Sequence, residues 1–288
     1  MYKRQIKTSE GYSSVNGLPA GTPLSGAIFA VYDKQNNVVD KFQTNENGIG
    51  SSKKLPLGIY TVKEVQAPAN YGLNPTVFTA DIEFAGQVVK LNVTDPVITA
   101  GVSIKKTGYA QTMNNNVMRW TVSGVRNDST TSLQSFYWRD TLPTDAVRLT
   151  RLVTGTYSTT QTYKVTFTTN LNSQWRTAYD NLSTAKNYTL DMSSAALGLA
   201  SNEYVTQFML SFGIVPAGFH QLTNATVDAQ TLYALTNGYK FTNKADVGGL
   251  LGGNWVQSIA RWTTSVYSHY VPAKPAAPKS PKLPRTGY

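Results

Sequence analysis

Short stretches rich in β-branched and aromatic residues, each closed by turn residues, run along most of this 288-residue chain. Over the first hundred residues they lie at 27–32, 38–43, 59–65, 77–84 and 87–94. Clusters of Asp, Asn, Gly and Pro separate them, and these residues favour turns that end strands. Several short strands at regular spacing predict a small antiparallel sandwich.

The same pattern continues after residue 96 over a longer stretch of chain. Further strands are predicted at 102–106, 118–125, 136–140, 149–153, 163–168, 204–212, 239–243 and 255–270. Residues 171–202 are rich in Asn, Ser, Thr and Ala, and we expect loops with a short helix there. The glycine-rich residues 248–253 are expected to form a flexible loop, because no phosphate-loop lysine follows them.

The fold class predicted from this pattern is all-β. The length suits two domains on the usual size of a domain. We expect two tandem immunoglobulin-like β-sandwich domains, at residues 1–96 and 97–270, followed by a Pro-rich tail at 271–288.

Composition removes several kinds of chemistry. The chain has no cysteine, which excludes disulfides, cysteine nucleophiles and thiolate zinc sites. His220 and His269 are the only histidines and have no metal-ligand spacing, so we expect neither a metal nor a cofactor. Any covalent reinforcement of this fold must come from another kind of bond.

The formal net charge of +10 is spread along the chain without a basic helix or a nucleic-acid motif. We therefore expect no nucleic-acid binding, and rather an attraction to an anionic cell wall or host matrix. No run of 18 apolar residues occurs, so we expect no membrane span in this sequence. No signal peptide follows Met1.

Alternation of side chains places two acids on inward faces in the first domain. Glu64 shares its face with Val62, and Asp95 shares its face with Val93. Buried carboxylates need partners or must stay protonated. Lys7 is the nearest candidate cation early in the chain.

The second domain repeats this arrangement with an amine on its first strand, an acid in the middle and an amide late. These residues are Lys106, Asp140 and Asn243. Each lies at the end of an apolar strand face, formed by Ile104, Trp138 and Phe241 respectively. The alternative is three ordinary polar residues at strand ends.

Two motif strings in the first domain carry a family resemblance. Residues 23–29 read Pro-Leu-Ser-Gly-Ala-Ile-Phe, and residues 55–68 read Leu-Pro-Leu-Gly-Ile-Tyr-Thr-Val-Lys-Glu-Val-Gln-Ala-Pro, with Tyr71 after them. Together they resemble the collagen-adhesin B-type (SpaA-like) domain of Gram-positive pilins. The resemblance covers about residues 1–96.

In that family a lysine on the first strand and an Asn or Asp on the last strand form an intramolecular isopeptide bond, with help from a glutamate. The resemblance implies a bond between Lys7 and Asp95 that is promoted by Glu64. Lys3 is an alternative donor, and Asn92 is a nearby acceptor on the wrong face. A buried ion-pair cluster without a covalent bond is the other alternative.

The second domain resembles the collagen-adhesin A-type domain, in which the promoting acid is an aspartate. The matching pieces are Lys-Thr-Gly at 106–108, Trp-Thr-Val at 120–122, Asp-Thr-Leu-Pro at 140–143 and Phe-Thr-Asn-Lys-Ala at 241–245. The resemblance implies a Lys106–Asn243 bond promoted by Asp140. Lys105 is an alternative donor.

The chemistry of such a bond requires burial. An amide forms only from a neutral amine and a protonated carboxyl or an amide, and burial lowers the pKa of a lysine and raises that of a carboxyl. Fixed contact supplies the effective concentration of the reacting groups. The product closes a loop of chain, as a disulfide does.

The end of the chain carries a third resemblance. Residues 271–282 have the composition of a polyproline spacer, which would span about 40 Å. The pentapeptide after it consists of Leu283, Pro284, Arg285, Thr286 and Gly287, and it resembles the sorting signal of sortase transpeptidases. In that family the enzyme cuts between Thr and Gly and joins the Thr carbonyl to an amine.

Taken together, the resemblances predict a secreted, wall-anchored structural pilin without an enzyme activity beyond forming its own bonds. The absence of a Tyr-Pro-Lys-type motif favours a basal minor pilin over a backbone pilin. Sortase, other pilin subunits and peptidoglycan are the expected partners, with a host matrix protein as a further one. The alternative is a stand-alone wall-anchored adhesin that binds host matrix protein, and a surface glycosidase is disfavoured because no free pair of catalytic carboxylates is identified.

Overall fold

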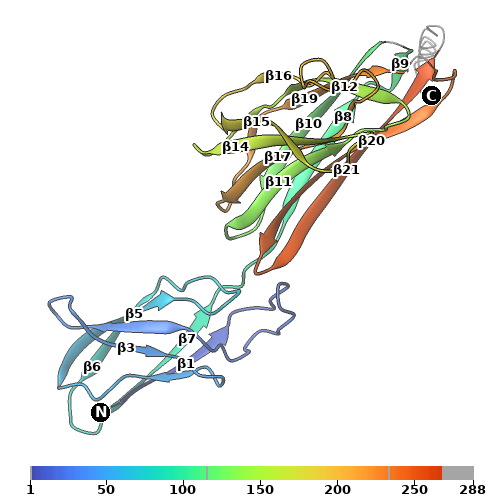
Figure 1. Cartoon of the computed structure of the whole chain (residues 1–288). Coiled ribbons are helices and arrows are strands. Elements are labelled where there is room, and N and C mark those ends of the chain that lie inside the picture. Colours follow the sequence, from blue (N-terminus) through green and yellow to red (C-terminus); the bar gives the residue numbers. More distant parts are fainter. Residues whose placement is uncertain (1, 115, 233, 268–288) are drawn as a thin grey trace, which may run out of the picture.

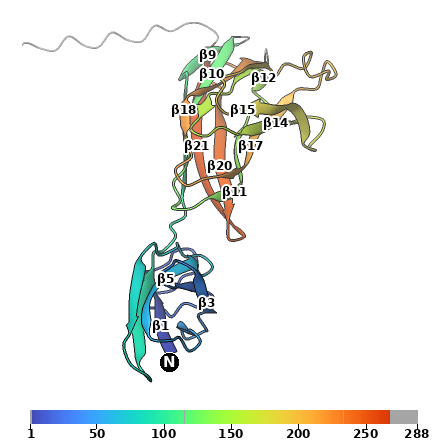
Figure 2. The ribbon, with the colours of Figure 1, turned by 90° about the vertical axis from the view of Figure 1, so that its left-hand side faces the viewer.

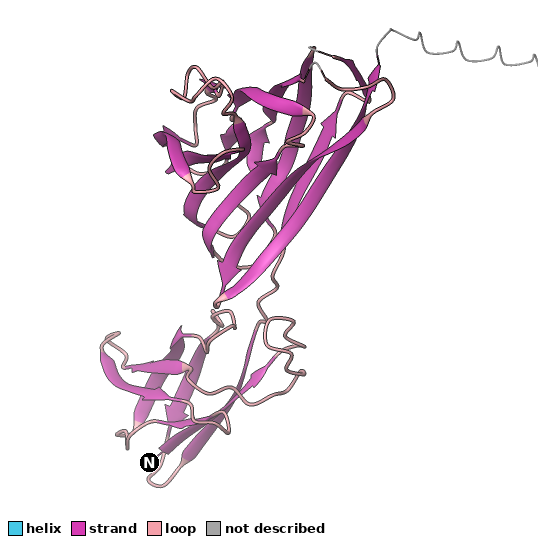
Figure 3. Cartoon of the chain, turned by 45° about the vertical axis from the view of Figure 1, so that its right-hand side comes forward, coloured by secondary structure: helices cyan, strands magenta, loops and turns pink. Residues whose placement is uncertain are grey.

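The computed structural model describes residues 2–114, 116–232 and 234–267. These residues form strands, turns and loops without a helix, which confirms the all-β prediction (Figure 3). The buried apolar side chains form two separate clusters, one among β1–β7 and one among β8–β21. We call these two groups of strands the first unit and the second unit.

The first unit contains seven strands in two sheets. They are β1 (Tyr2–Ser9), β2 (Ile28–Tyr32), β3 (Val38–Gln43), β4 (Ile49–Ser51), β5 (Gly58–Gln66), β6 (Val77–Ile82) and β7 (Val88–Asp95). One sheet has the order β3-β2-β5-β6 and the other β4-β1-β7. The first and last strands, β1 and β7, are parallel neighbours, which the expectation of a purely antiparallel sandwich did not include.

Apolar residues of both sheets fill the space between them. Phe29 and Val62 are fully buried there, and the ring of Phe29 stacks on that of Phe42 at a centroid distance of 5.7 Å. Strand alternation explains the part of this core that β5 supplies, because every second residue of β5 from Tyr60 to Glu64 is buried, whereas β2 is buried over three consecutive residues.

The second unit is larger and has fourteen strands. They are β8 (Val102–Gly108), β9 (Gln111–Met113), β10 (Val117–Asn127), β11 (Leu133–Thr141), β12 (Val147–Val153), β13 (Thr156–Tyr157), β14 (Thr162–Thr169), β15 (Arg176–Ser183), β16 (Thr189–Asp191), β17 (Val205–Val215), β18 (Gln221–Thr223), β19 (Ala225–Thr231), β20 (Lys240–Leu251) and β21 (Asn254–Tyr267). They form a five-stranded sheet (β16-β12-β19-β10-β8), a seven-stranded sheet (β15-β14-β17-β11-β20-β21-β9) and the short pair β13-β18.

Trp120 and Trp138, both fully buried, lie on strands of the two large sheets and form part of one core. Trp138 Nε1 donates a hydrogen bond of 2.8 Å to the hydroxyl of Tyr157, which satisfies the indole inside the core.

The structure corrects two sequence predictions in this unit. Residues 248–251 lie inside β20 and not in a loop, because they pair with residues 254–257 of β21, whereas residues 252 and 253 form the turn between the two strands. The predicted helix in 171–202 is also wrong, since residues 176–183 form β15 and pair with β14. Pairing to an available sheet edge decides the conformation there, which local composition did not reveal.

The two units lie end to end (Figures 1 and 2). Backbone contacts at the junction join the first unit to the start of the connection, with a bridge between Tyr71 and Val97 and a hydrogen bond of 2.8 Å from Gly72 N to Pro96 O. The domain limits proposed at residues 96 and 270 stay predictions, and the second of them lies outside the described residues.

Candidate functional site

The first cluster consists of Lys7, Glu64 and Asp95, and all three side chains are buried. The ammonium of Lys7 contacts Asp95 Oδ1 directly, and its Nζ lies 3.0 Å from Glu64 Oε1. Its Nζ also lies 5.3 Å from the centroid of the Phe29 ring. One cation therefore meets two carboxylates inside an apolar core.

Strand register brings these side chains together. On the parallel strands β1 and β7, Lys7 pairs with Val93 and Ser9 pairs with Asp95, so the carboxylate of Asp95 follows Val93 on the same face. Glu64 comes from β5 in the opposite sheet. Glu64 Oε2 accepts a hydrogen bond of 2.7 Å from the backbone N–H of Asn74, which orients the acid.

The electrostatics of the first cluster favour a neutral carboxyl at Asp95. Burial raises the pKa of Asp95 to about 7, against the lowering effect of Lys7 and with a further rise from Glu64. Two acids that share one lysine cannot both be stabilised as anions at low cost. Near neutral pH a substantial fraction of Asp95 is therefore the protonated acid, which is the form an amine can attack.

The second cluster consists of Lys106, Asp140 and Asn243, which are also buried. The ammonium of Lys106 contacts Asp140 Oδ2 directly, and its Nζ lies 5.7 Å from the Trp120 ring centroid. No aligned hydrogen bond from the described residues reaches Nδ2 or Oδ1 of Asn243. A buried side-chain amide without aligned hydrogen bonds is costly, so the core stabilises Asn243 poorly as a free amide.

The acid and the acceptor of the second cluster lie on adjacent strands. Asp140 on β11 pairs with Ala245 on β20, and Asn243 lies two residues from Ala245 on the same face. Lys106 belongs to β8 in the other large sheet. A bond from Lys106 to Asn243 would therefore connect two sheets.

Burial shifts both charged members of the second cluster toward neutrality. It lowers the pKa of Lys106, against the opposing pull of Asp140. It raises the pKa of Asp140, against the opposing effects of Lys106 and of the nearby Asn243. A neutral amine beside a protonated acid and an amide carbonyl is the arrangement that amide exchange requires.

The alternative residues lie away from the clusters. Lys105 and Asn92 are exposed, so neither side chain faces a core. The side chain of Lys3, His269, the spacer 271–282 and the sorting motif from Leu283 to Gly287 lie outside the described part of the chain. The ring of His220 is close to Gly218 O, at 2.8 Å from Nδ1.

Residues 2–267, apart from 115 and 233, contain no group of three His, Asp or Glu residues that could hold a metal ion. Over the same residues, no helix is long and apolar enough to cross a membrane.

The sequence analysis did not identify three residues with important polar contacts. Asn74 orients Glu64, although it lies in a loop whose pattern gave no sign of this contact. Two further buried acids, Asp228 and Asp246, lie beneath arginine side chains and not in the cores. The positions of these two acids in the strands carried no signal that an arginine on a neighbouring strand would cover them.

The family model described as "SpaA: Prealbumin-like fold domain" matches residues 14–97. This range includes Glu64 and Asp95, and Lys7 precedes it. The match gives the first unit a SpaA-like prealbumin fold, as the motif strings predicted.

Among curated proteins, the chain is similar to the "Trypsin-resistant surface T6 protein" of Streptococcus pyogenes serotype M6. The two are 32% identical over 123 residues, which is 43% of this chain and 20% of the relative. The chain therefore spans about a fifth of the length of this relative.

Solved pilin structures show a distant likeness to most of the chain. RrgB from Streptococcus pneumoniae matches at 13% identity and a TM-score of 0.35, over 88% of this chain and 48% of RrgB. The major pilin SpaD of Corynebacterium diphtheriae matches at 17% identity and a TM-score of 0.31, over 92% of this chain and 65% of SpaD. The major pilin BcpA of Bacillus cereus matches at 14% identity and a TM-score of 0.30, over 92% of this chain and 68% of BcpA. Likeness at this level says nothing about function.

Proposed function

We propose that this protein is a structural subunit of a Gram-positive pilus whose two units are each closed by a self-formed isopeptide bond. The observation that carries the proposal is the pair of buried clusters, each with a lysine in direct contact with an acid. The SpaA-like fold of the first unit and the similarity to a streptococcal surface protein support it.

In the first cluster, the side-chain nitrogen of Lys7 attacks the protonated carboxyl of Asp95. A C–N bond forms, the C–OH bond breaks and one water leaves. Glu64, 3.0 Å from Lys7 Nζ, takes the proton from the amine and delivers it to the departing oxygen. No oxidant or cofactor is needed, because the step is a condensation.

In the second cluster, Lys106 attacks the side-chain amide carbon of Asn243. A C–N bond forms, the C–NH₂ bond breaks and one ammonia leaves. Asp140, protonated because of its burial, donates a hydrogen bond to the amide oxygen and relays the proton from Lys106 to the leaving nitrogen.

Each bond would stabilise its unit by closing a long loop. Lys7 and Asp95 are 88 positions apart in the sequence. On the loop-entropy model, a crosslink of this span contributes roughly 4–5 kcal/mol. It would also carry tension directly between the first and last strands of the first unit, so that the strands between them are not unfolded by pulling.

The proposed attachment uses Thr286 of the sorting motif. Sortase would cleave after Thr286 and transfer its carbonyl to an amine of the wall precursor, with residues 271–282 as the spacer. The absence of a Tyr-Pro-Lys-type motif supports the basal, wall-linked position in the pilus. The protein would then be secreted and anchored in the cell wall.

Assembly can be tested with sortase, a major pilin and this protein in cells. We expect covalent ladders that contain both pilins, and Thr286→Ala should release these ladders from the wall fraction, because Thr286 is the proposed link to the wall precursor. A ladder without this protein, with the protein found only as a wall-linked monomer, would contradict the pilin proposal and favour the stand-alone adhesin that binds host matrix protein.

Bond formation has its own test. The intact mass of the folded protein should lie below the sequence mass by one water and one ammonia together. A mass equal to that of the plain sequence would refute both bonds and leave two buried ion-pair clusters.

A further inference from the structure

A hollow of about 710 Å³ lies on the outer face of the seven-stranded sheet, opposite to the face that carries Asp140 and Asn243. Its volume falls within the roughly 300–1,000 Å³ of small-molecule sites. Strands β11, β14, β17 and β21 supply most of its lining, which includes Ser135, Tyr137, Arg139, Trp175, Trp255 and Gln257. We call it the outer hollow.

The floor of the outer hollow carries a fixed polar network. Arg139 donates to both oxygens of Asp246, at 3.1 and 3.0 Å, and Asp246 is buried. The hydroxyl of Tyr137 donates to Asp246 Oδ2 at 3.1 Å and accepts from Gln257 Nε2 at 3.1 Å. These groups are held in place before any ligand arrives.

Two tryptophans stand at the sides of this floor. Trp255 is 54% exposed and Trp175 is 40% exposed, which is unusual for the largest apolar side chain. Trp255 lies on β21, and Trp175 lies in the loop directly before β15. In the sheet order, strands β14, β17, β11 and β20 lie between β15 and β21. The ring of Trp255 packs edge-to-face on Tyr137 at 5.8 Å.

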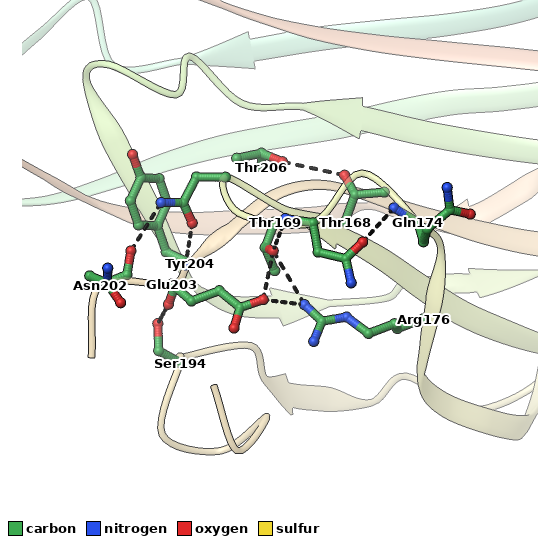
Figure 4. Close-up of polar contacts among 11 residues, drawn as sticks. Thr168, Thr169, Gln174, Arg176, Ser194, Asn202, Glu203, Tyr204 and Thr206 are labelled. Carbon is green, nitrogen blue, oxygen red and sulfur yellow. Dashed lines mark hydrogen bonds and ion pairs between the residues drawn. The ribbon is translucent and has the colours of Figure 1, made fainter. Parts of the chain in front are cut away.

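Contacts behind Trp175 hold its turn in position. The next residue, Arg176, bonds to Glu203 Oε1 at 2.5 Å and to Thr169 Oγ1 at 3.2 Å (Figure 4). Its guanidinium also lies 4.8 Å from the Phe167 ring. The preceding Gln174 donates its backbone N–H to Asn172 Oδ1 at 2.9 Å. The segment that presents Trp175 is therefore braced on both sides.

The backbone is irregular at two positions that line the outer hollow, Ser135 and Gly213. Ser135 has a φ of 50°, in the left-handed region that non-glycine residues rarely adopt, and it lies where the register between β11 and its neighbours shifts. Gly213 has a φ of 75°, and a Cβ on it would meet no atom within 4 Å. Bulges and strained residues of this kind gather at binding sites, where they re-aim side chains.

We propose that the outer hollow binds an oligosaccharide of pyranose units. The C–H faces of a sugar ring pack on the negative faces of aromatic rings, which Trp175 and Trp255 offer at the two sides. Sugar hydroxyls point in several directions and suit the floor, where Arg139, Gln257 and Tyr137 present polar atoms from three side chains. An extended peptide would need a row of backbone partners along one edge, which this floor does not form.

The proposal does not rest on the pilus function, because a sugar site could serve a pilin or a stand-alone adhesin. Two sources share the chemistry: the glycan strands of the bacterial wall and the glycans of a host surface. Titration of the purified protein with chitotetraose, a β-1,4-linked N-acetylglucosamine oligomer, probes the first. Titration with N-acetyllactosamine probes the second. Binding is followed by tryptophan fluorescence and by saturation-transfer NMR.

Variants assign any binding to the outer hollow. Trp255→Ala and Trp175→Ala should each weaken sugar binding about tenfold or more, as the loss of a central aromatic contact does. Ser211→Tyr, which fills the hollow from β17 and keeps both tryptophans, should abolish binding. Phe84→Ala is the matched control, because Phe84 is 60% exposed in the first unit and should leave binding unchanged.

Each outcome decides the proposal. Chitotetraose binding that these variants remove assigns a wall glycan, and N-acetyllactosamine binding assigns a host glycan. No binding of either sugar, or of any glycan on a broad array, overturns the proposal. Binding of a synthetic peptide of residues 271–282 that Ser211→Tyr abolishes, without any sugar binding, overturns it in favour of a peptide site.

Discussion

The two clusters would form the same kind of bond, but their lysine, acid and acceptor lie on differently arranged strands. In the first, donor and acceptor lie on the neighbouring strands β1 and β7 of one sheet, and the promoting acid Glu64 comes from the other sheet. In the second, Lys106 lies on one sheet, while Asp140 and Asn243 lie together on the other. The first bond would reinforce a pair of strands, and the second would connect the two layers of a sandwich.

The balance of charge also differs between the clusters. Lys7 has two acids within contact, so the loss of one acid leaves it an ionic partner. Among the described residues Lys106 has one acid, so the loss of Asp140 leaves it alone in the core. The acceptor is an acid in the first cluster and an amide in the second, so only the first should depend on the protonation of its acceptor. Single substitutions in and near the two clusters separate these differences by their effects on intact mass and on stability.

Asp140→Ala should have the largest effect on stability. It removes the acid that contacts the buried Lys106, which costs roughly 3–5 kcal/mol, and it also prevents the second bond. The variant should keep one ammonia in its intact mass, and calorimetry should show a large fall in the melting temperature of the second unit. Asp128→Ala is the control, because the Asp128–Arg126 pair is half exposed and should contribute little.

Glu64→Ala should have a smaller effect, because Lys7 keeps its contact with Asp95. The main loss is the crosslink itself, roughly 4–5 kcal/mol on the loop-entropy model. The intact mass should rise by one water relative to the wild-type protein, apart from the substitution itself, with lower resistance to protease in the first unit. Glu83→Ala, at an exposed position, should leave the crosslinks and the stability unchanged. Equal melting temperatures for the Glu64 and Glu83 variants would contradict a role for Glu64.

Asp95→Asn tests the acceptor and its dependence on pH. The amide that forms from Asn with loss of ammonia is the same product as from Asp with loss of water, so the bonded variant and the bonded wild type should have identical masses. Because burial raises the pKa of Asp95 to about 7, the wild-type acceptor becomes an unreactive carboxylate above that pH. Formation of the first bond after refolding should therefore slow as the pH rises through about 7.

The amide side chain that Asp95→Asn introduces has no proton to lose in this range, so the rate of the variant should not show the same decline. Mass spectrometry at intervals after refolding, at pH values of about 6 and about 8.5 on either side of the Asp95 pKa, provides the comparison. A decline of equal size in both proteins would show that another group controls the rate.

Lys105→Ala should have the smallest effect. Lys105 is exposed and its side chain points away from the second cluster, so stability should change by no more than about 0.5 kcal/mol. The mass should still show the loss of ammonia. Loss of the second bond in this variant would mean that Lys105 and not Lys106 is the donor.

Local patterns in the sequence were sufficient for the fold class and for the inward faces of the strands. Alternation depends only on neighbours in the chain, so the inward positions of Glu64 and Asp140 follow from the apolar residues two positions away. The motif strings around residues 55–68 were sufficient for the SpaA-like fold of the first unit. Local composition failed at 176–183 and 248–251, where pairing with a neighbouring strand decided the conformation.

Only the tertiary structure decided which inward residues meet. The parallel register of β1 and β7 brings Lys7 to Asp95 across 88 positions, and no local pattern specifies that register. The outer hollow depends in the same way on long-range pairing. Trp175 precedes β15 and Trp255 lies on β21, and four strands separate β15 from β21 in a sheet whose strand order the sequence does not reveal. Alternation is set within one strand, whereas contact between strands depends on how the whole chain packs.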